Sequence, residues 1–174
     1  MANAQRILGI DPGSTITGWG VIEAQGERLK IIDSGFVQPA KGPFQSRLAR
    51  IFIDLQAPCQ RYQPDVIAIE QVFMHRNADA ALKLGHARAA ALCASLNHCP
   101  DAIYAEYAPR DVKQAVVGSG SASKEQVQMM VKTLLRIDEF ERIDVSDALA
   151  VALCHALRSH YQDRVDAAMI KAAN

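Results

Sequence analysis

Arg6–Ile22 reads Arg-Ile-Leu-Gly-Ile-Asp-Pro-Gly-Ser-Thr-Ile-Thr-Gly-Trp-Gly-Val-Ile and predicts a strand, a tight turn and a second strand. The apolar run at 7–10 is typical of a central strand that is covered on both faces. Asp11 follows at the end of that run, and Pro12–Ser14 is a turn signal. One carboxylate therefore lies where a buried strand emerges, within reach of solvent and of a cation. The alternative is an aspartate that only initiates the turn.

The overall composition is that of an ordinary globular chain. The sequence has 174 residues, of which 49% are apolar and 22% are charged. We expect a single domain over residues 1–174, with a core at about 6–160 and a short tail at 161–174 that is either helical or frayed. The 19 basic and 19 acidic residues cancel, so a nucleic-acid ligand would need a local basic patch.

The sequence carries no signal for export or membrane insertion, and we expect a cytoplasmic protein. The first residues lack a basic segment followed by a long apolar run. No stretch approaches the roughly 18 continuous apolar residues of a membrane span. The cysteines show no CxxC spacing and are interpreted as reduced, mostly buried thiols rather than a zinc site or disulfides: Cys59, Cys93, Cys99 and Cys154.

A second acid repeats the placement of Asp11. Arg28–Val37 predicts a third strand that continues an antiparallel meander, and Phe44–Tyr62 predicts an amphipathic helix. Asp65–Glu70 is then a compact apolar strand, which a right-handed crossover would place parallel to the first. Glu70 would lie beside Asp11 at one edge of the sheet, although a single glutamate at a strand end is usually just solvated.

The second half of the chain predicts helices around one more strand. Asn77 can cap a helix that runs to about Asn97, whose stripe of small residues would either pack against the sheet or form a homodimer seam. Ala102–Glu106 predicts a fifth strand, Pro109 opens a short helix, and another helix spans about 121–136. The fold class is therefore α/β, with a five-stranded mixed sheet (three antiparallel strands, then parallel ones) flanked by helices.

Asp144 and Asp147 open the last long helix, predicted at Ala148–His160 after a loop at 137–143. Three residues apart, the two acids are neighbours on one helix face. Each could simply cap the helix or favour its dipole. A helix needs only one cap, however, and two acids crowded against two more at strand ends call for a cation.

Basic side chains flank the flexible segment Gly118–Ser121. Arg110, Lys113 and Lys124 would form a local basic patch there, suited to phosphate contact near a helix N-terminus. The alternative is that they are ordinary helix-surface residues.

Four carboxylates without sulfur or imidazole partners select the hard cations Mg2+ or Mn2+. Two such ions about 3.5–4 Å apart can activate a water and stabilise a leaving oxygen, which suits phosphodiester hydrolysis. The predicted metal-binding and catalytic acids are Asp11, Glu70, Asp144 and Asp147.

Five segments carry a distinctive combination of motifs: Gly9–Ser14 (Gly-Ile-Asp-Pro-Gly-Ser), Ala68–Met74 (Ala-Ile-Glu-Gln-Val-Phe-Met), Ala81–Gly85 (Ala-Leu-Lys-Leu-Gly), Val112–Gly118 (Val-Lys-Gln-Ala-Val-Val-Gly) and Asp147–Ala150 (Asp-Ala-Leu-Ala). Together they closely resemble the RuvC family of bacterial Holliday-junction resolvases, over about residues 6–160. The resemblance implies a ribonuclease-H-like fold, a homodimer, and paired symmetric nicks across four-way junction DNA that leave 5′-phosphates. It also implies a preference for a short T-rich sequence and work with the RuvA–RuvB branch-migration complex.

The resemblance also implies roles for particular side chains. It makes the four acids catalytic ligands of Mg2+, with Mn2+ as a substitute and two ions per site. It matches Phe73 to an aromatic residue that stacks on a base near the crossover, and Lys113 and Lys124 to basic residues near the scissile phosphate. Lys124 is accordingly the fifth predicted catalytic residue and would steady charge on the phosphate, whereas Lys113 would mainly position the DNA backbone. Arg76, Lys83 and Arg110 are further candidates for DNA contact. One departure is the tail, which has few basic residues for a DNA-gripping role.

Three other functions fit parts of the pattern. Asp11–Thr15 also matches the first phosphate loop of actin-like and sugar-kinase-like ATP-binding proteins, but that architecture needs a second lobe and a second loop. A DNA-binding module without catalysis would not need all four acids. A related nuclease that acts on other branched nucleic acid stays open, because the acids define the reaction better than the substrate.

Overall fold

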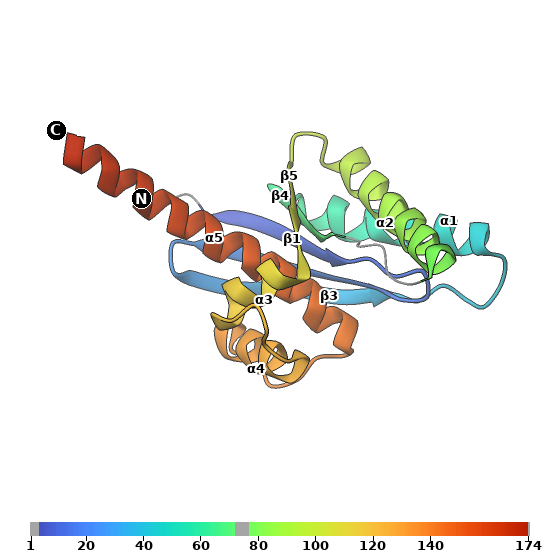
Figure 1. Ribbon diagram of the computed structural model, residues 1–174. Helices are drawn as coiled ribbons and strands as arrows, with labels where there is room; N and C mark the ends of the chain where they lie inside the picture. Colours follow the sequence, from blue (N-terminus) through green and yellow to red (C-terminus); the bar gives the residue numbers. More distant parts are fainter. Residues whose placement is uncertain (1–3, 72–76, 174) are drawn as a thin grey trace.

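Five strands form one mixed sheet in the order β3-β2-β1-β4-β5 (Figure 1). The computed structural model describes residues 4–71 and 77–173. β1 pairs antiparallel with β2 and β2 with β3, whereas β1 and β4, and β4 and β5, are parallel. This confirms the predicted mixed sheet. The strands are β1 Gln5–Asp11, β2 Thr17–Gln25, β3 Arg28–Val37, β4 Val66–Glu70 and β5 Ile103–Tyr107.

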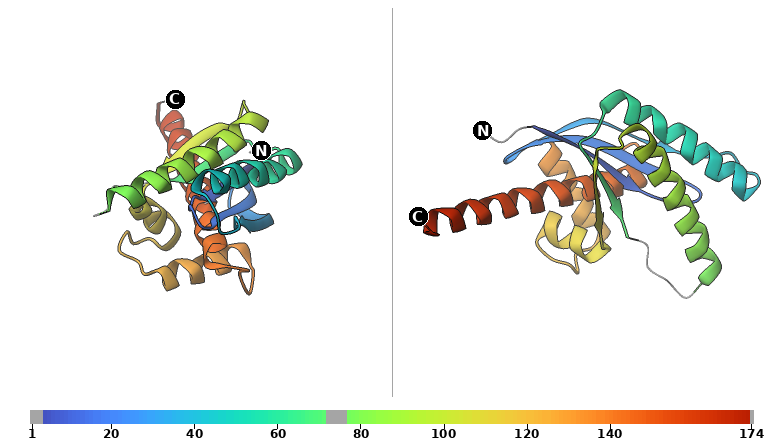
Figure 2. Two further views of the ribbon diagram at one scale, coloured as in Figure 1. Left: turned by 90° about the vertical axis from the view of Figure 1, so that its right-hand side faces the viewer. Right: turned by 90° about the horizontal axis from the view of Figure 1, so that it is seen from above.

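Helices cover both faces of the sheet (Figures 1 and 2). α1 and α2 pack on one face, and α3, α4 and α5 on the other. The last helix is longer than predicted, because it begins at Ile143 and its C-terminal part continues through most of the predicted tail, beyond the sheet (Figure 2). The helices are α1 Phe44–Tyr62, α2 Ala78–His98, α3 Pro109–Val117, α4 Lys124–Leu135 and α5 Ile143–Ala173.

Side-chain caps set the start of two helices. The Asn77 side chain accepts a hydrogen bond from the Ala80 N–H at 3.2 Å, as predicted for α2. α4 begins at Lys124, later than the expected start near Ser121, because Ser123 and Gln126 form a capping box that satisfies both backbone N–H groups. The cap places Lys124 in the first turn of α4.

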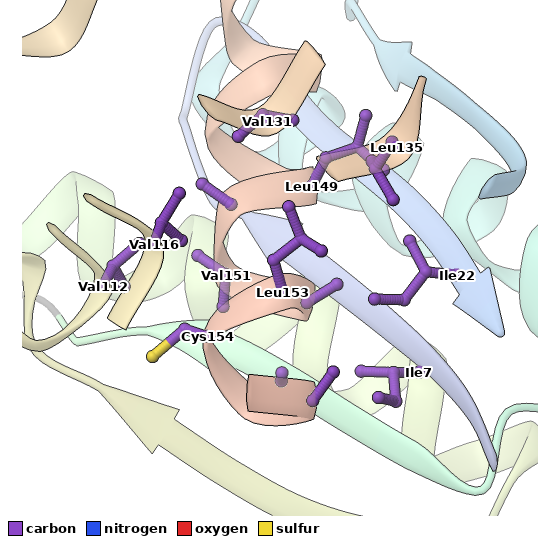
Figure 3. Close-up of a cluster of buried hydrophobic side chains, with 14 of the residues drawn as sticks. Ile7, Ile22, Val112, Val116, Val131, Leu135, Leu149, Val151, Leu153 and Cys154 are labelled. Atoms are coloured by element: carbon purple, nitrogen blue, oxygen red, sulfur yellow. The ribbon is translucent and has the colours of Figure 1, made fainter. Parts of the chain in front are cut away.

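The two faces bury separate cores. Leu8, Ile10 and Val21 pack under α1 and α2, while Ile7 and Ile22 pack under α5 (Figure 3). This alternation follows from the two-residue period of a strand. On α2 the buried positions include Ala87, Ala91 and Ala94, whereas Leu82 of the predicted small-residue stripe is 64% exposed. That stripe therefore does not pack against the sheet.

α5 lies unusually close to β1 and β2 because glycines face it. A Cβ atom built on Gly9 would lie 2.1 Å from the Ala148 carbonyl oxygen, and one on Gly18 would lie 2.0 Å from that of Asp144. A Cβ on Gly20 would meet the Leu149 side chain at 2.4 Å. At Gly9 and Gly18 the atoms met belong to the helix backbone, so only glycine allows this approach, and these two glycines position the helix that carries two of the acids.

The helices and the cysteines of the described residues bear on the expected location of the protein and on disulfides. No helix within residues 4–71 and 77–173 has the length and apolar character needed to cross a bilayer. All four cysteines are free thiols; Cys93 is exposed and the other three are buried.

Candidate active site

The two strand-end acids lie side by side. The parallel register of β1 and β4 pairs Gly9 with Ala68 and Ile10 with Ile69, so the next positions are Asp11 and Glu70. Both acids continue the alternation of Gly9 and Ala68 and therefore project toward the α5 face of the sheet. The two acids therefore lie at the ends of adjacent parallel strands, and their catalytic and metal-binding roles stay predictions.

The first turns of α5 bring the other two acids to the same edge. Gly18 is the antiparallel partner of Asp11, and the Asp144 backbone sits directly against Gly18. Asp147 lies three residues further along α5, next to the fully buried Ala148. The three separate segments thus converge at one corner of the molecule.

The electrostatics of Asp11 show how tightly the acids are grouped. Burial, together with the negative charges of Glu70, Asp147 and Asp144 in that order, raises the pKa of Asp11 from 3.8 to about 8. Lys124 opposes this shift. A carboxyl group held in this way favours any partner that brings positive charge, because a cation would relieve both the burial cost and the repulsion.

The pKa values of Glu70 and Asp147 are raised in the same way. Burial is the main cause that raises the pKa of each, and the Asp147 charge adds to the effect at Glu70. The Lys124 ammonium, whose Nζ lies 3.4 Å from Asp147 Oδ2, lowers both pKa values in turn. The acids raise the pKa of Lys124, Asp147 most of all, so this lysine stays charged.

A cleft of about 480 Å3 opens beside these groups. Glu70, Asp147, Lys113 and Lys124 supply its charged lining, and apolar residues of α3, α4 and α5 supply its walls. Of the predicted basic residues, Lys113 and Lys124 therefore border the acids.

The other predicted DNA-contacting residues lie outside this cleft. Arg110 is exposed and packs its side chain beside Gly120. Lys83 is on the exposed side of α2, where Nζ lies 2.6 Å from Asp79 Oδ2. Phe73 and Arg76 fall outside the described residues.

Sequence reasoning missed residues that hold the site in place. The buried Thr17 hydroxyl donates to the Gly13 carbonyl at 2.9 Å and accepts from the Gly13 N–H at 3.3 Å, which braces the turn after Asp11. Arg47 of α1 donates to the Ser14 carbonyl of the same turn at 3.1 Å. A threonine four residues after the turn glycine was a local signal for the first contact; nothing in the sequence pointed to the second.

Asp144 has its own basic neighbour. Arg142 Nε lies 3.8 Å from Asp144 Oδ2, and the Arg142 guanidinium lies over the Phe36 ring at 5.0 Å. Asp144 is therefore tied to the rim of the site, whereas Asp11 and Glu70 are set deeper. Arg142 is two residues from a predicted ligand, but its role as a brace depends on β3, which sequence spacing could not reveal.

The donor set fits a hard divalent cation, because every candidate ligand is a carboxylate oxygen. Among the described residues, no three Asp, Glu, His or Cys side chains are arranged closely enough to surround an ion as they stand. The fit therefore rests on donor chemistry and on the mutual charge of the acids, and the metal-binding roles remain a prediction.

Comparison with known proteins decides the family. The family model described as crossover junction endodeoxyribonuclease RuvC matches residues 7–155. This chain belongs to the RuvC family. The RuvC of Geobacter metallireducens is 53% identical over 152 residues, covering 87% of this chain and 92% of that protein. The RuvC of Alkalilimnicola ehrlichii is 48% identical over 160 residues, covering 92% and 96%.

Solved structures agree with this RuvC assignment. A structure described as Thermus thermophilus RuvC in complex with Holliday junction substrate has a TM-score of 0.83 at 32% identity, over 91% of this chain and 96% of that one. The yeast mitochondrial Holliday junction resolvase Ydc2 has a TM-score of 0.65 at 13% identity, over 93% of this chain and 84% of that one, and shows the shared fold alone.

These matches confirm the ribonuclease-H-like fold class and the enzyme class. The chain is a member of a family of metal-dependent endodeoxyribonucleases, which decides against an ATP-binding protein of the actin or sugar-kinase type.

Proposed function

We propose that this RuvC-family chain resolves Holliday junctions by paired symmetric nicks in four-way junction DNA, leaving ligatable ends with 5′-phosphates. The observation that carries the proposal is the gathering of four acids at one corner: the charges of Glu70, Asp147 and Asp144 act on the buried Asp11, and Glu70 and Asp147 line the charged cleft. Relatives named as crossover junction endodeoxyribonucleases, at about half-identical sequence, support the substrate. The chemistry is direct hydrolysis, with no covalent enzyme intermediate.

The four acids have one task, which is to hold cations against a DNA strand. Asp11, Glu70, Asp144 and Asp147 are the ligands in this proposal, and their oxygens suit Mg2+, with Mn2+ as a substitute. When bound, two such ions lower the pKa of an attacking water and stabilise the leaving oxygen. Asp11 and Glu70, at the ends of adjacent strands, give the site its rigid side, and α5 supplies the other.

Lys124 has a separate task from the acids. Its ammonium, 3.4 Å from Asp147 and 70% exposed, can turn toward a phosphate oxygen in the cleft and steady the charge that develops there. Lys113, from α3, lines the same cleft and positions the DNA backbone. The positive charges of both lysines offset part of the negative charge of the acids in the cleft. Without them the cleft would repel a DNA phosphate.

Assembly and wider DNA contact are part of the same proposal. Phe73 stacks on a base near the crossover, and Arg76, Lys83 and Arg110 contact the junction arms. Two copies act together as a homodimer, for which the exposed small-residue side of α2 is available. The RuvA–RuvB branch-migration complex is the proposed partner and the cytoplasm the proposed location.

A nicking assay tests the proposal. A labelled synthetic four-way junction is incubated with the protein in Mg2+, in Ca2+ and with a chelator, alongside a fork, a flap and a linear duplex. We expect symmetric nicks in the junction with Mg2+ only. We expect Asp11→Asn and Asp144→Asn to lower the nicking rate at least about 1000-fold, because each removes a ligand charge.

Binding separates catalysis from substrate recognition in this assay. Both variants should still bind the junction, measured by gel shift in Ca2+, because junction arms are held by other residues. Full activity of Asp11→Asn would refute the assignment of the acids. Equal cutting of the flap or fork would instead favour a nuclease for other branched DNA, and loss of junction binding would show that the variant is misfolded or that the acid positions DNA.

A further inference from the structure

A second groove, of about 650 Å3, lies away from the acidic cleft. One wall is the start of β3 with the residue before it, and the other is the end of α4 with the residue after it. α4 is 12 residues long, so its two ends are about 18 Å apart, and Lys124 of the cleft is at the opposite end. The lining residues are Glu27, Arg28, Leu29, Lys30, Ile31, Leu134, Leu135 and Arg136.

The groove follows the open edge of the sheet. β3 is the terminal strand, and the only strand that pairs with it in the described residues is β2. Successive residues of a strand point to opposite faces, yet consecutive residues 27–31 all line the groove. Because residues that point to both faces of the sheet line the groove, the groove runs along the edge of the strand. At that edge every second residue presents an N–H and a C=O to an incoming chain.

Its lining combines an apolar floor with a basic rim. Leu29, Ile31 and Leu134 are partly buried against the core and Leu135 is 4% exposed, so the floor is formed by aliphatic side chains. In the described residues, no ion pair joins Arg28, Lys30 or Arg136 to an acid.

The one acid of the lining is already engaged. Glu27 Oε1 lies 3.8 Å from Arg164 Nη1 and 3.9 Å from His160 Nε2. The groove is therefore a positive site on a chain whose formal charges sum to zero.

We propose that this groove binds an extended acidic peptide segment of a partner protein, which adds as a sixth strand to β3. The strand edge supplies the backbone hydrogen bonds, and the leucines and isoleucine take alternate apolar side chains. Arg28, Lys30 and Arg136 select acidic residues at the other positions. A second copy of this chain is disfavoured, because two β3 edges would bring the same cations together. DNA would use the cations but neither the floor nor the strand edge.

Fluorescence anisotropy with a defined probe tests the proposal. The probe is a labelled 12-residue peptide that alternates glutamate with valine and threonine, and its matched control has lysine in place of glutamate. We expect the acidic probe to bind the full-length protein at least about tenfold more tightly than the lysine peptide. Equal binding of both peptides, or none of the acidic one, would overturn the proposal and leave a basic edge that only guards against aggregation.

Backbone methylation distinguishes strand addition from simple charge attraction. Two versions of the probe are N-methylated at alternate residues, one version on each edge of the peptide. Only the version that blocks the edge facing β3 should lose binding, by at least about tenfold, because only those N–H groups enter the ladder. If both versions bind like the parent, no strand is added and the proposal fails.

Variants locate the site on this chain. Lys30→Glu with Arg136→Glu should weaken the acidic probe at least about tenfold, whereas Lys41→Glu, an exposed basic residue outside the groove, should not. The double variant should keep its junction-nicking rate, which shows that it is folded; Lys30→Gln with Arg136→Gln replaces it if it is not. Displacement of the probe by junction DNA, with weaker junction binding of the double variant, would make the groove a DNA contact and refute the peptide proposal.

Discussion

The two faces of the sheet are packed by opposite means. Under α1 and α2, branched residues such as Leu8, Ile10 and Ile69 fill the space between strand and helix. Under α5, Gly9 and Gly18 carry no side chain, and the helix backbone lies directly against the strands at these two positions. Both faces bury apolar side chains and so contribute stability, and on the α5 face the close glycine contacts also fix where the helix begins.

This difference explains why the acids lie on the α5 face. A helix that rests on glycines cannot slide without opening a gap or a clash, so Asp144 and Asp147 keep their position relative to Asp11. A helix held over bulky side chains can adjust by repacking them. The contrast predicts that small changes on the α5 face act on catalysis, and that changes on the other face act on stability alone.

Among the changes that test this contrast between the faces, Gly18→Ala has the largest expected effect. The new Cβ would lie 2.0 Å from the Asp144 carbonyl, a contact that only a shift of the start of α5 can relieve. We expect the junction-nicking rate to fall at least about 100-fold, equivalent to ~2.7 kcal/mol of transition-state stabilisation, together with a lower Tm. The assay is single-turnover nicking in Mg2+, with Tm measured by calorimetry.

Gly42→Ala is the matched control for this variant. Gly42 lies in the loop before α1, and a Cβ there would meet no atom within 4 Å. It should leave both the nicking rate and Tm nearly unchanged. If Gly18→Ala cut junctions at the parent rate, the close approach of α5 would be irrelevant to the acids.

Two leucine truncations compare the faces directly. Leu55 of α1 and Leu149 of α5 are both fully buried, and each leucine-to-alanine change should cost about 2–5 kcal/mol of the free energy of unfolding. Only Leu149→Ala should also lower the nicking rate of the folded protein. Leu149 follows Asp147 by two residues on α5, and its side chain packs against Gly20 of β2. Urea unfolding and nicking below the transition measure the two effects separately. Equal nicking by both variants would contradict the division of roles between the faces.

The contrast between the faces also marks the limit of sequence-based prediction here. Periodicity and turn residues placed β1, β2, β3 and α1 well, because each signal lies within its own element. The same reasoning assigned no role to Gly9 and Gly18, because their contacts lie in a helix more than 120 residues away.

The candidate site shows the same limit. The positions of the acids at two strand ends and one helix start were enough to predict that they lie at one corner of the molecule. The braces at Arg47 and Arg142 depend on contacts with distant elements that no local spacing encodes. The extension of α5 past His160 was left open, because its exposed turns have no buried stripe that would mark a helix.

The smallest expected effect concerns the stability of the metal-free protein. Without a cation, the crowding of acids on the α5 face lowers the free energy of unfolding. The pKa of Asp11 is raised to about 8 in the folded state by burial and by neighbouring carboxylates, against 3.8 ordinarily. The folded protein therefore holds this proton where the unfolded chain has released it, so stability falls as the pH rises from about 4 to about 8 and stays low above that. In chelator at pH 8.5, Asp11→Asn should be more stable than the parent.

We expect that difference to be about 1 kcal/mol, or a Tm higher by ~3 °C for a domain of this size, and to vanish toward pH 4. Thermal unfolding in chelator across this pH range measures it, with Asp33→Asn as a control, because Asp33 is a partly buried acid of β3 away from the cleft. Mg2+ should reverse the order at pH 8.5, because the ion stabilises only the protein that keeps the carboxylate. The prediction fails if the parent is more stable than the variant in chelator at pH 8.5, or if Mg2+ raises the Tm of the parent no more than that of the variant. Either result would show that Asp11 is not destabilised by burial and neighbouring carboxylates and is not stabilised by a bound cation.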